Sequence, residues 1–314
     1  MQPTLTSLSA ATRIALLFMF LMIGLILATG MITLFDKLVT PGEMDELTRV
    51  YTGTLLQSLI AIAAPAVMLA FLTEKFPAGS LGMTGNRRMG RGFAYALAIF
   101  FFSYPTVSFL TQMNSQMILP DAFSELAQTL RSMEDAAMET TTLILSVEHG
   151  GGLLLNLLLI ALLPAVTEEL FFRGALQQLL HRWLGNGHVA VWIAAAIFSL
   201  IHFQFYGFLP RMVLGALLGT LFLYSHNLWI PILFHFVNNA TVILLHFFWG
   251  DAYWLTELDE MPLTLPFLLT AVGGALVTLL LFYHFRKKST LPAVQQNKNK
   301  NKNNDTNRKY TTVG

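Results

Sequence analysis

The sequence predicts an all-α fold, a polytopic membrane helix bundle with about eight transmembrane helices. Hydrophobic residues make up 54% and charged residues 12% of the 314 residues, whereas a soluble domain carries about a quarter charged residues. The mean hydropathy is +0.58, and the apolar residues gather in long runs. The net charge of +1 gives no overall field that would attract nucleic acid, so we expect no nucleic-acid partner.

Eight apolar segments approach the length that a helix needs to cross a bilayer, about 20 residues. These segments are 12–35, 53–72, 93–113, 151–180, 189–205, 208–225, 228–249 and 264–285. The first is longer than the core of a cleavable signal sequence, so we expect it to be a membrane span. The chain has no cysteine, which excludes disulfides, thiolate nucleophiles and cysteine-ligated metals.

The charges of the linkers alternate along these spans and predict a topology. The 73–92 linker and the 286–314 tail are basic, and the tail holds eight Lys or Arg and one Asp. The 114–150 and 250–262 linkers are acidic, with Arg131 as their one Lys or Arg. Because basic linkers stay in the cytoplasm, we expect a multi-pass protein of the cell membrane with both termini cytoplasmic.

The spans and linkers divide the chain into four expected regions. Residues 1–150 form an N-terminal membrane region of three spans with their linkers, and 151–250 form a core that carries buried polar residues. Residues 251–286 supply a C-terminal span, and 287–314 form a basic tail of low complexity that we expect to be disordered. Within the 114–148 linker, "AFSELAQTLRSMEDAAMETT" predicts a short amphipathic helix outside the bilayer.

Polar residues on three spans are expected to meet at one depth. Glu168 and His202 are each 17 residues from residue 185, the centre of the Gly- and Asn-rich turn "WLGNGH". In an antiparallel helix pair both side chains then lie roughly 20–25 Å from that turn. His235 and Asn239 are four residues apart on one helical face of a third span, and Asn239 reaches about 18 Å from the preceding linker. We therefore expect a buried polar cluster that water enters from the cytoplasm.

Other polar residues near this cluster are expected to have structural roles. Glu169 and Arg173 are four residues apart, in the order that favours a helical ion pair, while Glu168 is turned about 100° away. Arg211 falls at the outer end of its span, where we expect it to snorkel or pair. The small residues of "GALLG", 215–219, predict a close helix contact.

Three segments of this core resemble the ordered motifs EExxxR, FxxxH and HxxxN/D. They are "EELFFR" (Glu168, Glu169, Arg173), "FSLIH" (Phe198, His202) and "HFVNN" (His235, Asn239). These motifs mark the CPBP family, the CAAX-protease and bacteriocin-processing (Abi-type) intramembrane endopeptidases, which are similar to the type II CAAX prenyl endopeptidases. The resemblance covers about residues 150–250 and leaves the first three spans and the tail outside it.

The resemblance implies an intramembrane endopeptidase whose helices enclose a conical active-site cavity. It implies that Glu168 and His202 activate a water, that His235 and Asn239 hold the oxyanion, and that Glu169, Arg173 and Phe198 support them. Its substrate would be a peptide or a membrane protein, with or without a lipid, and membrane lipids would be partners. The family has been described both as glutamate-dependent and as metal-dependent.

Two alternatives stay open from the residues alone. Glu168, His202 and His235 are also a possible set of three ligands for Zn²⁺ with an open position for water, although we favour catalysis without a cofactor. The same polar cluster would also suit an ion or solute transporter, or remain in a catalytically silent membrane scaffold.

Overall fold

The structure, a computed structural model, describes residues 5–38, 45–84, 89–250 and 262–310, with side chains as far as residue 288. All regular secondary structure within these ranges is helical, which confirms the predicted fold class. The elements are α1 (Ala10–Leu38), α2 (Glu46–Leu56), η1 (Gln57–Ala63), α3 (Ala64–Thr73), α4 (Pro77–Ser80), α5 (Met89–Ser115), η2 (Asp121–Phe123), α6 (Ser124–Leu145), α7 (Gly150–Asn156), η3 (Leu157–Leu162), α8 (Leu163–Glu169), η4 (Leu170–Gln177), α9 (Gln178–Leu184), α10 (Gly187–Leu200), η5 (Phe205–Gly207), α11 (Phe208–Ser225), α12 (Trp229–Trp249) and α14 (Leu265–Tyr310).

Seven helices in the described part of the chain are long and apolar enough to cross a membrane, one fewer than the sequence predicted. The difference lies in the segment 189–205, whose helix α10 has 14 residues and ends at Leu200. At about 1.5 Å per residue, this helix is roughly 21 Å long, short of a hydrocarbon core of about 30 Å. The chain turns after Leu200, where Phe203 has a left-handed backbone with φ 54°, so the helix cannot continue.

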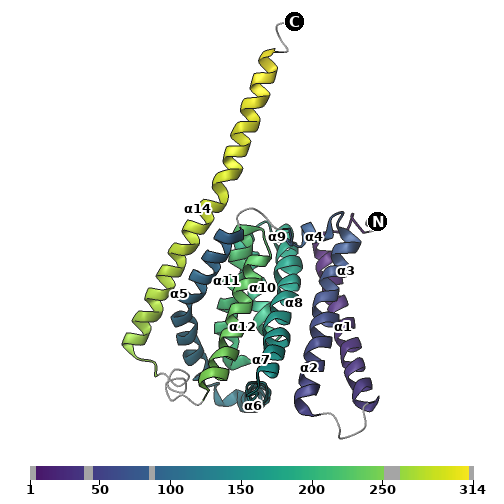
Figure 1. Cartoon of the computed structure of the whole chain (residues 1–314), viewed down its shortest axis with the longest axis vertical. Coiled ribbons are helices and arrows are strands. Elements are labelled where there is room, and N and C mark those ends of the chain that lie inside the picture. The colour runs from purple at the N-terminus through teal and green to yellow at the C-terminus, as the bar shows by residue number, and fades with distance from the viewer. Residues whose placement is uncertain (1–4, 39–44, 85–88, 251–261, 311–314) are drawn as a thin grey trace.

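The helices are arranged so that both ends of the chain lie at the same end of the bundle (Figure 1). Figure 1 shows α1 with α2 and α3 along one side, α5 and α14 along the other, and α7 to α12 between them. Helix α6 lies at the opposite end of the bundle. Its presence confirms the prediction of a helix in the 114–148 linker. An even number of passages through the bundle, including α10, returns the chain to its starting side.

Two of the three π-helical segments among the described residues end two residues before a proline. Segment η1 ends at Ala63, two residues before Pro65, and η3 ends at Leu162, two residues before Pro164. Proline has no N–H to donate, and its ring clashes with the carbonyl four residues earlier, so the preceding turn widens. The third segment, η4, follows Glu168 and Glu169 and carries Arg173, so the helix is irregular where its charges lie.

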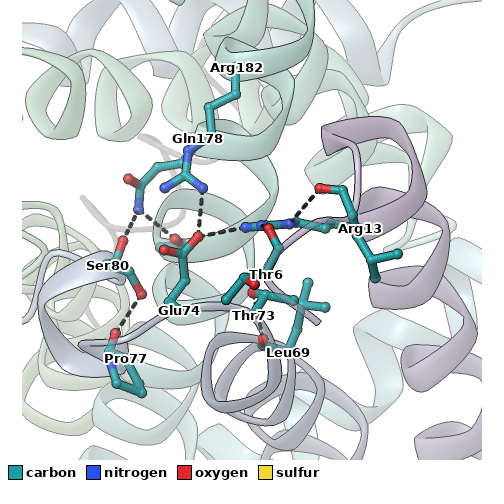
Figure 2. A network of polar contacts seen from close by, with 11 residues as sticks. Thr6, Arg13, Leu69, Thr73, Glu74, Pro77, Ser80, Gln178 and Arg182 are labelled. Carbon is teal, nitrogen blue, oxygen red and sulfur yellow. Dashed lines mark hydrogen bonds and ion pairs between the residues drawn. The ribbon is translucent and has the colours of Figure 1, made fainter. Parts of the chain in front are cut away.

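The N-terminal helices are joined to the central ones by an ionic network at the end of the bundle that holds the termini. Glu74, which follows α3, accepts hydrogen bonds on one carboxylate oxygen from Arg13 of α1 and Arg182 of α9, each at 2.7 Å (Figure 2). Beside it, Gln178 of α9 donates to the carbonyl of Ser80 at 2.6 Å. One acid thus connects three helices that are far apart in the sequence.

The C-terminal helix differs from its prediction. Helix α14 includes the expected span at 264–285, but its backbone continues to Tyr310, through most of the tail that was expected to be disordered (Figure 1).

Candidate active site

The residues of the three motifs meet at one cavity of about 610 Å³ inside the bundle. Its walls include Glu168 from α8, Phe198 from α10, His202 from the turn after α10, and His235 and Asn239 from α12. The expectation that these side chains come together from separate spans is therefore met by the geometry, even though α10 is shorter than predicted.

His235 stands between the two adjacent glutamates. Its Nδ1 lies 2.9 Å from Glu169 Oε1, and its Nε2 lies 3.8 Å from Glu168 Oε2. The carboxylate of Glu169 is held by a cation, so Nδ1 carries the proton and donates it to that oxygen. A separation of 3.8 Å is too long for a direct hydrogen bond but close enough for an electrostatic contact. The ring is thus oriented by one acid and presents its other nitrogen toward the second.

The expected pair of Glu169 and Arg173 is present and buried. Arg173 Nη1 donates to Glu169 Oε1 at 2.6 Å, and both side chains are at most 1% exposed. The second guanidinium nitrogen donates to the carbonyl of Gly215 in α11 at 2.9 Å. One turn further along both helices, Gln177 donates to the carbonyl of Gly219, also at 2.9 Å. These bonds need a close approach of α11, which the glycines of "GALLG" allow, as predicted.

His202 is oriented by the end of helix α10. Its Nδ1 lies 2.7 Å from the carbonyl of Phe198, and a carbonyl only accepts, so Nδ1 carries the proton. The neutral ring therefore has its lone pair on Nε2. Glu168 and His202 line the same cavity. Among the described residues, however, the imidazole close to the Glu168 carboxylate is that of His235.

Phe198 is the packing centre of the site. Its ring lies 4.9 Å from the ring of His202 and 6.1 Å from that of His235, edge to face in both pairs. The guanidinium carbon of Arg173 lies 5.0 Å from its centroid. Because the side chain is 4% exposed, one aromatic ring keeps both imidazoles and the buried cation in fixed relative positions.

The amide side chains of α12 complete the wall of the cavity. Asn239 and its neighbour Asn238 both line it, and Asn238 donates to the amide oxygen of Asn239 at 3.3 Å. This bond leaves the NH₂ group of Asn239 as a donor for a group inside the cavity. The sequence pattern indicated Asn239 through its spacing from His235 but did not indicate Asn238.

The cavity extends toward the end of the bundle opposite the termini. Thr141, Ile144 and Leu145 of α6 line it, and α6 lies at that end (Figure 1). Among the described residues, none of the lining side chains comes from the linkers beside the termini. With both termini in the cytoplasm, the cavity would extend away from the cytoplasm, and the expected entry of water from the cytoplasm does not fit this arrangement. The expectation came from the equal depth of residues in two helices. Equal depth does not indicate from which side a cavity opens.

Gln204 and Arg211 are further polar residues of the cavity wall that the sequence did not assign to the site. Arg211 was expected to snorkel or pair at the end of its span. It lies in the first turn of α11 and pairs with Gln204 from the preceding turn, on the wall of the cavity. The sequence feature that could have indicated Arg211 is the helix break "GFLP", 207–210, directly before it. This break separates two membrane segments beside the site.

The geometry of Glu168, His202 and His235 bears on the alternative zinc site. The hydrogen bonds on Nδ1 of His202 and His235 are of the kind that orients metal-binding imidazoles. In the part of the chain that the structure describes, however, no three His, Asp or Glu side chains are close enough together to hold a metal ion. The arrangement of Glu168, His202 and His235 therefore does not fit a zinc site, and we derive no step through a metal.

The fold and the site together describe one class of protein. It is a polytopic helical membrane protein with an acid, two imidazoles and an amide around one internal cavity. Residues 150–241 match the family model described as Type II CAAX prenyl endopeptidase Rce1-like, so this segment is similar to that family. All the residues of the candidate site lie within it. At the level of the family, this match supports a CAAX-type intramembrane endopeptidase.

One curated relative is similar to part of the chain. The uncharacterized protein YpbD of Bacillus subtilis (strain 168) is 30% identical over 89 residues, which cover 27% of this chain and 42% of that protein. The match thus spans under half the length of the relative. No solved structure matches the chain.

Proposed function

We propose that this protein is an intramembrane endopeptidase that hydrolyses peptide bonds with a water held by Glu168 and the site histidines, without a metal. The observation that carries the proposal is the position of His235, which is held by the buried Glu169–Arg173 pair and faces Glu168 across 3.8 Å at the cavity wall. A neutral packing residue would not need a buried ion pair to orient it.

The proposed reaction begins with a water bound between Glu168 and the Nε2 atom of His202. Glu168 takes a proton from this water as its oxygen attacks the carbonyl carbon of the scissile bond. Asn239 donates its NH₂ group to the resulting oxyanion, and His235 donates from Nε2 when its ring carries both protons. The carbon–nitrogen bond then breaks, and the proton on Glu168 passes to the leaving amine.

The proposed substrate is a peptide or a segment of a membrane protein, with or without an attached lipid, that enters the cavity within the cell membrane. The cavity of about 610 Å³ holds several residues of an extended peptide rather than a folded domain. With both termini in the cytoplasm, a topology that rests on the basic linkers, the α6 end of the cavity faces away from the cytoplasm.

Cleavage of a peptide library by purified protein tests this function. We expect the wild type to cleave and Glu168→Gln to lose at least about 100-fold in rate, because a general base contributes roughly 10²–10⁴-fold. Glu139→Gln, which changes an exposed acid on α6, serves as the matched control and should cleave normally.

Three results would reject the proposal. Equal cleavage by the wild type and Glu168→Gln would remove Glu168 from the mechanism. The absence of cleavage by the folded wild type would favour a silent scaffold, or a transporter if ions cross liposomes that contain the protein. A chelator should leave the rate unchanged, and loss of activity that Zn²⁺ restores would establish the metal-dependent alternative.

A further inference from the structure

Arg211 brings a positive charge to the wall of the cavity that contains the candidate catalytic residues. The residue is partly buried in the first turn of α11 and lines the cavity together with Glu168, His202 and His235. The mechanism proposed above does not use it. A cation in a membrane-spanning segment is costly and is retained where it has a partner or a function.

The contacts of Arg211 leave most of its hydrogen-bonding capacity unused. Its Nη2 donates to the side-chain oxygen of Gln204 at 2.5 Å, and its Nη1 lies 3.5 Å from the carbonyl of the same residue. A guanidinium has five N–H donors arranged for planar, bidentate recognition of a carboxylate. Gln204 engages the group from one side, so further donors remain for a ligand in the cavity.

No carboxylate of the described residues forms an ion pair with Arg211, although two acids lie in its electrostatic environment. These acids are Glu134 of α6 and Glu168 of α8. The Oε2 atom of Glu134 is buried and has no hydrogen-bond partner among the described residues. This arrangement contrasts with Arg173, whose carboxylate partner lies at 2.6 Å. Among the described residues, Arg173 thus forms an ion pair with a carboxylate, whereas Arg211 forms none.

The local backbone keeps space for the guanidinium. A Cβ atom added to Gly207 would lie 3.1 Å from Nη2 of Arg211 and 3.6 Å from Cζ. A side chain at this position would crowd the group, and glycine leaves it room. Gln204 and Gly207 both line the cavity beside Arg211, so the turn between α10 and α11 contacts this cation and holds it at the cavity wall.

We propose that Arg211 binds a carboxylate of the substrate and so selects peptides that carry an acidic group close to the scissile bond. The inference rests on the proposed function, because it takes Glu168 and His235 in the same cavity as the point of cleavage. The carboxylate is either the C-terminus of the peptide or an acidic side chain, since both present the same two oxygens to the guanidinium.

Binding to an inactivated protein tests this proposal independently of catalysis. Glu168→Gln protein in detergent is titrated with three fluorescent peptides of one sequence: a free C-terminal carboxylate, a C-terminal amide, and an amide with one acidic side chain near the end. We expect one or both carboxylate peptides to bind at least about tenfold more tightly than the neutral amide, as for a charge-assisted bidentate contact. The stronger of the two identifies the source of the carboxylate.

Substitutions of Arg211 in the same background decide whether the preference depends on this residue. We expect Arg211→Gln to abolish the difference between the carboxylate and amide peptides, and Arg211→Lys to keep part of it, because lysine retains the charge without the planar fork. Arg131→Gln is the matched control: Arg131 lies on α6 and stacks on Tyr206, 3.5 Å from its ring centroid, outside the cavity wall. Thermal unfolding of each variant shows that it is folded.

The outcomes separate this proposal from the proposed function. Equal binding of all three peptides, or a preference that survives in folded Arg211→Gln, overturns the role of Arg211 even if the wild type cleaves peptides. A preference lost in Arg211→Gln but kept in Arg131→Gln supports it. Should the wild type bind carboxylate peptides through Arg211 and cleave none of them, the binding site stands and the endopeptidase is rejected.

Discussion

At the scale of single residues, the adjacent acids Glu168 and Glu169 have different surroundings. Glu169 is fully buried and contacts both Arg173 and His235. Glu168 lines the cavity, and its side chain is 21% exposed. Successive helical residues point about 100° apart, so one acid is directed into the protein and the other into the cavity. The sequence predicted this division from spacing alone.

The buried pair leads to a prediction about stability. We expect Arg173→Met to destabilise the protein by about 3–5 kcal/mol, since it leaves the fully buried Glu169 without its cation. The double variant Glu169→Gln with Arg173→Met should recover part of the loss, because it buries no unpaired charge. Thermal unfolding in detergent measures both. A double variant less stable than Arg173→Met would show that the acid does not depend on this cation.

At the scale of elements, irregular backbone positions the site. The short helix α10 ends at Leu200, so His202 lies in a turn and its ring bonds to the carbonyl of Phe198. The π-helical segment η4 directs Arg173 and Gln177 to the carbonyls of Gly215 and Gly219. Regular periodicity indicates which residues are near the site, but departures from it set where each side chain points.

The network around Glu74 gives a prediction for the attachment of the N-terminal helices (Figure 2). We expect Glu74→Gln to lower the free energy of unfolding by about 1 kcal/mol, because it removes the negative charge that Arg13 and Arg182 share. The effect is small because the Arg182–Glu74 ion pair is partly exposed and screened by solvent. Unfolding midpoints of Glu74→Gln and of the exposed control Glu139→Gln measure the effect. An unchanged midpoint for Glu74→Gln would mean that apolar packing alone holds these helices.

At the scale of the whole molecule, α6 and the termini lie at opposite ends of the bundle (Figure 1). Residues of α6 line the cavity, so the cavity reaches toward the end away from the termini. The basic linkers lie at the end of the termini, and the acidic α6 lies beside the cavity. If the basic end is cytoplasmic, the proposed protease receives its substrates from the membrane and its outer side.

The absence of cysteine from the chain makes this topology directly measurable. We expect a membrane-impermeant maleimide to label Ser132→Cys on α6 in intact cells, because that exposed residue lies on the outer side in the proposed topology. Lys75→Cys, at the end that holds the termini, should react only after the cells are permeabilised. Labelling in the reverse order would place the cavity mouth on the cytoplasmic side.

The sequence by itself determined the helical membrane fold, the buried pair of Glu169 and Arg173, and the meeting of Glu168, His202, His235 and Asn239 at one place in the bundle. These features follow from hydrophobic run length and helical spacing, which are local and regular. Only the tertiary structure decided that α10 stops short, that His235 is the imidazole in contact with both glutamates, and that Arg211 lines the cavity. Each of these depends on where a turn or a neighbouring helix redirects the chain, and residue counting assumes straight helices that neither shorten nor widen.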